Sequence, residues 1–169
     1  MNIKSITQSR LAWALLSLLS FSAIGIALTA QHFFDMTPCY LCILQRIGVI
    51  TIGCFSLLAA INPKNFILRR AGYLGWALGA ALGLYAGGKL LYMQSQPLDI
   101  FSTCSMGADQ LMERFSFFEY IPILFQGSGS CTESAGSFIG VSFETWTFSL
   151  FAALTVVLVS VITNRYSKP

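Results

Sequence analysis

Four long apolar segments dominate the sequence and limit its folding more than any other feature. They cover about residues 11–30, 41–61, 71–93 and 146–162, and each is close to the roughly 20 residues that a helix needs to cross a bilayer. Charged residues make up only 10% of the chain, whereas soluble proteins contain about 25%. The sequence therefore predicts an all-α membrane protein, a four-transmembrane-helix bundle, and its 169 residues fit a single integral membrane domain.

The first apolar segment shares one feature with a signal peptide, because Lys4 and Arg10 precede it. Its charge-free run is nevertheless longer than the roughly 7–15 residues of a signal core, and Leu28 does not suit an A-x-A cleavage site. We expect this segment to be retained as a helix. With four spans, both termini lie on the same side of the membrane.

The basic residues predict which side that is. Seven of the ten lysines and arginines lie in the two tails and in the connection between the second and third segments, and three lie elsewhere: Arg46, Lys89 and Arg114. Cytoplasmic segments of membrane proteins carry the excess of such residues. We therefore expect cytoplasmic termini, with the connections at about residues 31–40 and 94–145 on the outer side.

The long outer connection between the third and fourth segments contains a stretch suited to a membrane surface. Residues 108–125, "ADQLMERFSFFEYIPILF", mix large apolar side chains with Glu113, Arg114 and Glu119, as a short interfacial helix does. A small folded loop that buries these aromatic residues on itself fits the same composition. Both interpretations place this stretch outside the bilayer core.

Small residues recur at every fourth position of the third apolar segment. Ala71, Gly75, Gly79, Gly83 and Gly87 would share one helix face, along which a neighbouring backbone can approach closely. We interpret this face as a packing seam rather than a cofactor site.

Five cysteines are the main chemical feature of the chain: Cys39, Cys42, Cys54, Cys104 and Cys131. Cys54 lies inside the second segment, about 18 Å along a helix from Cys42, and we expect it to be a packing residue. The other four fall on the outer side, where secretory compartments permit disulfides. They could form a zinc site, a structural disulfide or a relay of two redox pairs.

Spacing argues against a bound metal. Zinc sites usually combine two close-spaced pairs, whereas Cys104 and Cys131 are far apart and the only histidine is His32, which we expect at the interface. Haem attachment requires a histidine directly after C-x-x-C, and Ile43 occupies that position. A bridge between Cys104 and Cys131 could stabilise the loop, but it would not account for the C-x-x-C pair.

The C-x-x-C pair, Cys39 and Cys42, lies where the second helix should begin. This spacing is typical of thiols that oxidise reversibly, and a helix N-terminus favours the thiolate. Arg46 follows Cys42 by one turn and would place a cation beside the sulfur, although an arginine that only reaches to the interface fits the same position. A dithiol releases two electrons, and the chain has no flavin or dinucleotide motif. A lipid-soluble quinone is the simplest acceptor at this location.

These features resemble the disulfide bond formation protein B family of bacterial inner membranes. The resemblance covers nearly the whole chain and rests on "PCYLCILQR" at residues 38–46, "FSTC" at 101–104 and "GSGSCTE" at 127–133. It implies an inner-membrane protein-dithiol:quinone oxidoreductase with periplasmic cysteine loops. Its partner would be a DsbA-like thioredoxin-fold oxidase, its electron acceptor ubiquinone or menaquinone, and no nucleic acid would be involved.

The resemblance also implies a role for each matching residue. Cys104 would form the mixed disulfide with the partner, and Cys131 would exchange with Cys39. Cys42 would contact the quinone, with Arg46 beside it. The redox-active pairs would thus be Cys39 with Cys42 and Cys104 with Cys131.

Two other classes of protein fit part of the pattern. A vitamin K epoxide reductase-like enzyme also combines a C-x-x-C at a helix edge with loop cysteines and a quinone, but the local motifs fit it less well. A tetraspanin-like scaffold would have four spans and a disulfide-bonded outer loop, yet it would not need C-x-x-C beside an arginine.

The family that this chain resembles also has a glutamine shortly before the cysteine that matches Cys104. Either Gln94 or Gln96 matches that glutamine, and its role stays open.

Overall fold

Four long helices account for most of the structure, a computed structural model that describes residues 9–33, 39–95, 137–138 and 140–166. The helices are α2 (Arg10–Phe33), α3 (Tyr40–Ile61), α4 (Phe66–Gln94) and α7 (Phe143–Tyr166). Each is long and apolar enough to cross a membrane. The predicted all-α, four-helix fold is confirmed, whereas the expected interfacial stretch at 108–125 lies outside the described residues.

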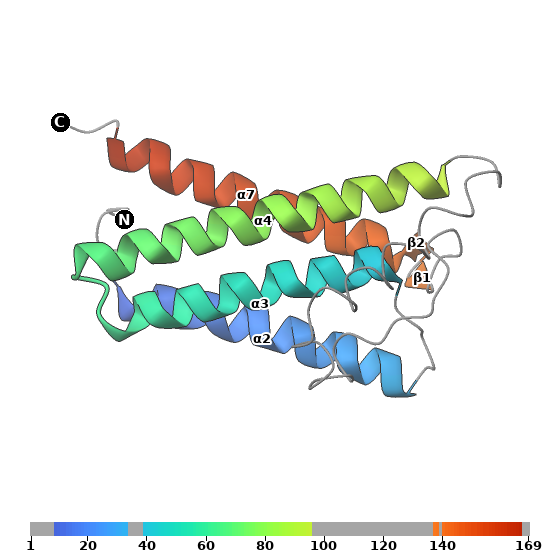
Figure 1. Ribbon diagram of the computed structural model, residues 1–169, viewed down its shortest axis with the longest axis horizontal. Coiled ribbons are helices and arrows are strands. Elements are labelled where there is room, and N and C mark those ends of the chain that lie inside the picture. Colours follow the sequence, from blue (N-terminus) through green and yellow to red (C-terminus); the bar gives the residue numbers. More distant parts are fainter. Residues whose placement is uncertain (1–8, 34–38, 96–136, 139, 167–169) are drawn as a thin grey trace, which may run out of the picture.

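The helices form a bundle in which neighbours in sequence are neighbours in space. Helix α3 packs most extensively against α4, while α2 packs against α3 and α7 packs against α4 (Figure 1). Figure 1 also shows that α2 begins and α7 ends at the same end of the bundle, where the connection between α3 and α4 lies. The start of α3, with the C-x-x-C pair, is at the opposite end of the bundle from the start of α2 and the end of α7.

The turn between α3 and α4 is fixed by capping. Asn65 is the N-cap of α4, and its side-chain oxygen accepts a 3.0 Å hydrogen bond from the backbone N–H of Ile67, which satisfies one of the free donors of the first turn. Arg69 donates a 3.2 Å hydrogen bond to the carbonyl of Pro63. These contacts explain why α4 begins five residues before the apolar run that starts at Ala71.

The small-residue face of α4 is confirmed as a packing seam. A methyl group added to Gly48 of α3 would lie 2.7 Å from the carbonyl oxygen of Gly79, so the two backbones touch directly. Gly83 on the same face is covered by the ring of Phe151 from α7. The seam therefore brings α3 and α7 against one side of α4, and the main core cluster draws on all four helices: Trp13, Val49, Ile52, Ala59, Trp76, Ala80, Phe151 and Leu158.

Apolar side chains also cover the outside of the bundle. Leu11, Ile67 and Val156 are among many large hydrophobic residues that are exposed, as expected for a surface that meets lipid instead of water. Cys54 is exposed on this outer surface. The expectation that it packs inside the protein is wrong, because its position on α3 faces away from the other helices.

A short hairpin leads into α7. Strands β1 (Ser137–Phe138) and β2 (Val141–Ser142) pair antiparallel, and Gly140 takes the positive φ of 74° that the turn requires. The hydroxyl groups of Ser142 and Thr145 lie 2.8 Å apart across the first turn of α7. This fixed start, which the sequence pattern does not predict, sets the position of Glu144.

Candidate functional site

The C-x-x-C pair is found at the start of α3, as the sequence predicts. Cys39 is the N-cap residue with extended backbone, and its carbonyl accepts the first helical hydrogen bond from the N–H of Ile43 at 3.1 Å. Cys42 lies one turn further along. Both are free thiols, and their sulfur atoms are 2.9 Å apart in a thiol–thiol hydrogen bond. Sulfur atoms this close can be joined by small changes in side-chain torsion.

Cys39 is the buried member of the pair. Its side chain is 4% exposed and packs with Leu41 of α3 and with Ala86 and Leu90 of α4. The hydrogen bond from the Cys42 thiol lowers the pKa of Cys39 from 9.0 to about 7, and burial opposes this change only in part. The contact with Cys42 therefore favours the thiolate form of Cys39 in the dithiol state.

A cavity of about 330 Å³ lies beside this pair, between α2, α3 and α7. Alanine, isoleucine, valine, leucine and aromatic side chains form most of its wall, and the polar lining residues are Gln31, Cys42, Gln45, Arg46, Glu144 and Thr147. Cys42 lines the cavity, whereas Cys39 is not among its lining residues. The two sulfurs of one pair thus have different surroundings.

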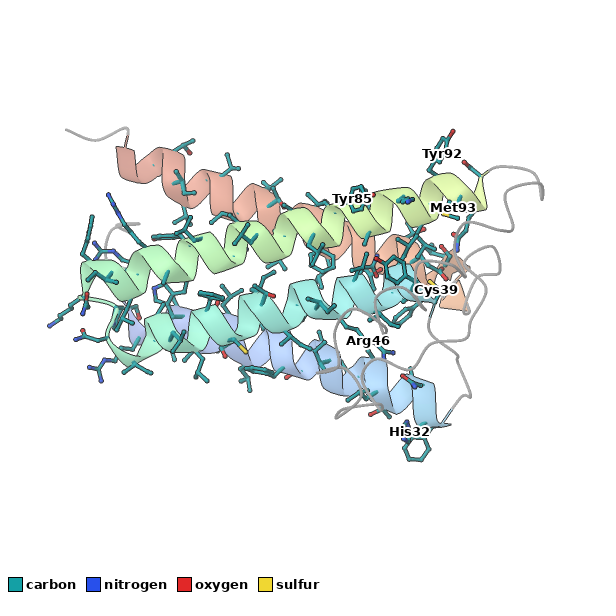
Figure 2. All side chains as sticks on the ribbon, viewed as in Figure 1. His32, Cys39, Arg46, Tyr85, Tyr92 and Met93 are labelled. Atoms are coloured by element: carbon teal, nitrogen blue, oxygen red, sulfur yellow. The ribbon has the colours of Figure 1, made fainter. Side chains whose placement is uncertain are left out.

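Arg46 is held inside the protein by a polar contact between helices. Its side chain is 9% exposed, and Nη1 donates a 2.8 Å hydrogen bond to Oε1 of Gln31 on α2 (Figure 2). This geometry does not support the alternative of an arginine that only reaches to the water interface. The guanidinium instead contributes a permanent positive charge to the cavity that Cys42 lines.

Two further polar residues of the cavity escaped the sequence analysis. Gln45 is 7% exposed, and its Nε2 has no hydrogen-bond partner among the described residues. Gly87 of α4 makes room for that amide, because a methyl group there would lie 3.0 Å from Nε2. Glu144, in the first turn of α7, is 4% exposed. Polar residues inside or at the edge of an apolar segment were the available signal for both.

Two other residues considered in the sequence, His32 and Gln94, are not among the residues that line this cavity. His32 is exposed at the end of α2, where Figure 2 shows it pointing away from the bundle. Gln94 is the last residue of α4. Cys104, Cys131 and Gln96 lie outside the described residues, so the second cysteine pair stays a prediction.

Comparison with known proteins assigns the chain to a family. Residues 9–161 match the family model "Disulfide bond formation protein DsbB". Disulfide bond formation protein B of Marinobacter nauticus is 34% identical over 160 residues, which cover 94% of this chain and 95% of that protein. The protein of the same name from Chromobacterium violaceum is 39% identical, over 79% of this chain and 81% of its own length. The Shewanella amazonensis protein is 31% identical, over 97% and 96%. The chain therefore belongs to the DsbB family and is a multi-pass membrane oxidoreductase of disulfide bond formation.

Proposed function

We propose that this protein oxidises a periplasmic, DsbA-like thioredoxin-fold oxidase by disulfide exchange and transfers the electrons to a membrane quinone. The observation that carries the proposal is the position of Cys42. Its sulfur is 2.9 Å from that of Cys39, and the same residue lines a largely apolar cavity together with Arg46. A pair in this arrangement can exchange disulfides through one sulfur while the other meets an acceptor in the membrane.

The cavity suits a quinone in size and chemistry. Its volume of about 330 Å³ falls in the range of roughly 300–1,000 Å³ that is usual for small-molecule sites. The apolar wall fits a quinone ring, and the guanidinium of Arg46 can donate hydrogen bonds to a carbonyl oxygen of the quinone. When bound, ubiquinone or menaquinone would supply an acceptor for two electrons and two protons.

Thiol–disulfide exchange would deliver the electrons to this pair. The partner's thiolate attacks the disulfide between Cys104 and Cys131, and Cys131 then attacks the disulfide between Cys39 and Cys42 at Cys39. The partner's second thiol then displaces Cys104 and the partner leaves as a disulfide. The freed Cys104 displaces Cys39 from Cys131, which re-forms the disulfide between Cys104 and Cys131 and leaves Cys39 and Cys42 as a dithiol. Each exchange breaks one S–S bond and forms another. The hydrogen bond from Cys42 to the Cys39 sulfur then stabilises the thiolate of Cys39.

The proposed location follows from the same chemistry. The partner must reach the cysteine end of the bundle, so this end would face the periplasm and both termini the cytoplasm. The distribution of lysine and arginine supports this orientation in the bacterial inner membrane. Family membership favours this function over an epoxide reductase or a scaffold without turnover.

The proposal is tested by an anaerobic assay with purified protein. We expect loss of quinone absorbance when a reduced thioredoxin-fold partner is added, with one partner disulfide formed for each quinone reduced. A variant with Cys39→Ser and Cys42→Ser is the control and should give no reaction. If the wild-type protein oxidises the partner without consuming quinone, or reduces a quinone epoxide but not the quinone, the proposal is wrong.

A further inference from the structure

The start of α7 contributes an acidic residue to the cavity that the exchange steps leave without a role. Glu144 is 4% exposed and lines the same cavity as Cys42 and Arg46. Among the residues that the structure describes, it is the only acidic side chain on this cavity. Glutamate is seldom buried to this extent unless it balances a charge or transfers a proton.

The charges of the cavity indicate which of these roles fits. Arg46 is permanently positive, and ionised Glu144 balances it. Loss of a proton from the Cys42 thiol would add a further negative charge to a region of low dielectric, where an unbalanced charge is costly. The total charge stays constant if Glu144 accepts that proton as the thiol releases it.

The proton that must leave is on the sulfur that faces the cavity. When Cys39 is the thiolate, the Cys42 thiol is the donor in the contact between the two sulfurs, and this contact favours the Cys39 thiolate. Cys39 is not among the residues lining the cavity, whereas Cys42 and Glu144 both are. A proton leaving Cys42 therefore enters the space that Glu144 shares.

We propose that Glu144 is a catalytic proton carrier, which takes the proton of the Cys42 thiol and delivers it to the bound quinone. This inference rests on the proposed function. As the bond between Cys39 and Cys42 forms, the pair loses two electrons and two protons in all, and the quinone gains the same number. One proton passes through Glu144, which then returns to its ionised state. The other proton left for water when Cys39 ionised, and water returns one proton to the quinone.

Few other titratable groups could take this role. On α3 the candidates around the cavity are the two thiols and Arg46, and Gln31, which α2 contributes, is uncharged. Strand β2 carries no titratable residue. In the outer half of α4 the titratable side chains are all exposed: Tyr85, Lys89 and Tyr92. Glu144 is thus the one carboxylate in the described part of the chain that is placed to exchange a proton with Cys42.

The first test needs no quinone. In protein whose only cysteines are Cys39 and Cys42, the rate of Cys42 alkylation is measured against pH for wild type and Glu144→Gln. Because Glu144 and Cys42 line the same cavity, we expect loss of the carboxylate to shift the alkylation midpoint. An unchanged midpoint would mean that the two groups do not interact, which overturns the proposal.

The second test measures re-formation of the disulfide after the dithiol form is mixed with a short-chain quinone. We expect Glu144→Gln to slow it roughly 100-fold, with unchanged quinone affinity and a flattened pH profile. Glu144→Asp should retain part of the rate and the pH profile. Thr145→Val, which removes the hydroxyl contact at the start of α7 but keeps the carboxylate, is the structural control and should react as wild type.

Each outcome of the second test has a defined meaning. Equal rates for wild type and Glu144→Gln, or a loss confined to quinone affinity, would overturn the role of Glu144 and leave the proposed function standing. Failure of the wild-type protein to reduce quinone would instead overturn the proposed function itself. Exchange of the Glu144→Gln disulfide with reduced partner, expected at the wild-type rate, shows that the variant is folded.

Discussion

Arg46 on α3 and Gln31 on α2 are joined by a 2.8 Å hydrogen bond between guanidinium and amide oxygen. Gln31 is uncharged and accepts the hydrogen bond without neutralising the arginine, so the guanidinium keeps its positive charge beside the cavity. The bond also joins the outer end of α2 to α3, which is its main packing neighbour and the helix that carries the cysteines.

Replacing the cation should separate quinone reduction from disulfide exchange. We expect Arg46→Ala to lower the rate of quinone reduction roughly 10- to 100-fold, because it removes a charge placed where negative charge develops. Exchange between the partner and the cysteines should continue. Arg46→Lys keeps the charge and should recover part of the rate, and Gln31→Leu should have a smaller effect than Arg46→Ala. The measurements are quinone absorbance for reduction and partner alkylation for exchange; equal loss of both in Arg46→Ala would contradict this prediction.

The four proposed redox cysteines should each be required for turnover. Cys39→Ser, Cys42→Ser, Cys104→Ser and Cys131→Ser should each abolish partner-driven quinone reduction, because every exchange step needs the sulfur that the variant lacks. Cys54→Ala is the matched control. Its side chain is exposed on the outside of the bundle, so this variant should keep most of the activity. Normal turnover in a variant without Cys104 and Cys131 would show that no relay operates.

The reactivity of Cys39 should change near neutral pH. Its pKa is lowered from 9.0 to about 7, chiefly by the hydrogen bond from Cys42, so the thiolate fraction should rise as pH increases through about 7. The midpoint is measured by alkylating Cys39 in the dithiol form from about pH 5 to about pH 10 and following the product by mass spectrometry. Cys42→Ala removes the hydrogen-bond donor and should move the midpoint to higher pH. A midpoint near 9 in the wild-type dithiol would contradict the assigned contact.

The contact between α3 and α4 should make Gly79 intolerant of even a methyl group. A Cβ at this position meets the backbone carbonyl of Gly48, which cannot rotate away, so we expect Gly79→Ala to destabilise the protein by about 1–3 kcal/mol. Gly25→Ala on α2 is the control, since nothing lies within 4 Å of its added methyl. That change should be neutral or stabilise the helix. Thermal unfolding in detergent compares the stability of the Gly79→Ala and Gly25→Ala variants. Equal stability would show that α3 and α4 can move apart at Gly79 without loss of free energy of unfolding.

Much of the fold could be predicted from sequence because each helix is encoded locally. A run of about 20 apolar residues is a span wherever it occurs, and glycines at every fourth position identify a close packing face without knowledge of the partner helix. Cys54 shows the limit of this reasoning. Its depth in the membrane follows from residue counting, but whether it faces lipid or another helix depends on which side of α3 packs against α4.

The site was predictable in part for the same reason. Cys39, Cys42 and Arg46 are close in sequence, so helix geometry alone brings them together. Gln31 and Glu144 come from helices before and after, and only the packing of the bundle places them on the same cavity. Gln45 adjoins Arg46 in sequence, yet its importance depends on the space left by Gly87.

The backbone contact between Gly48 and Gly79 has a consequence for redesign. It joins α3 and α4 into a stiff unit, and α3 carries both sulfurs of the C-x-x-C pair. The opposite walls of the cavity belong to α2 and α7, which supply small and aliphatic residues such as Ala27 and Leu150. Enlarging or reducing these side chains would alter the shape of the space without displacing the reactive atoms, so engineering for an acceptor of different size would begin on those two helices.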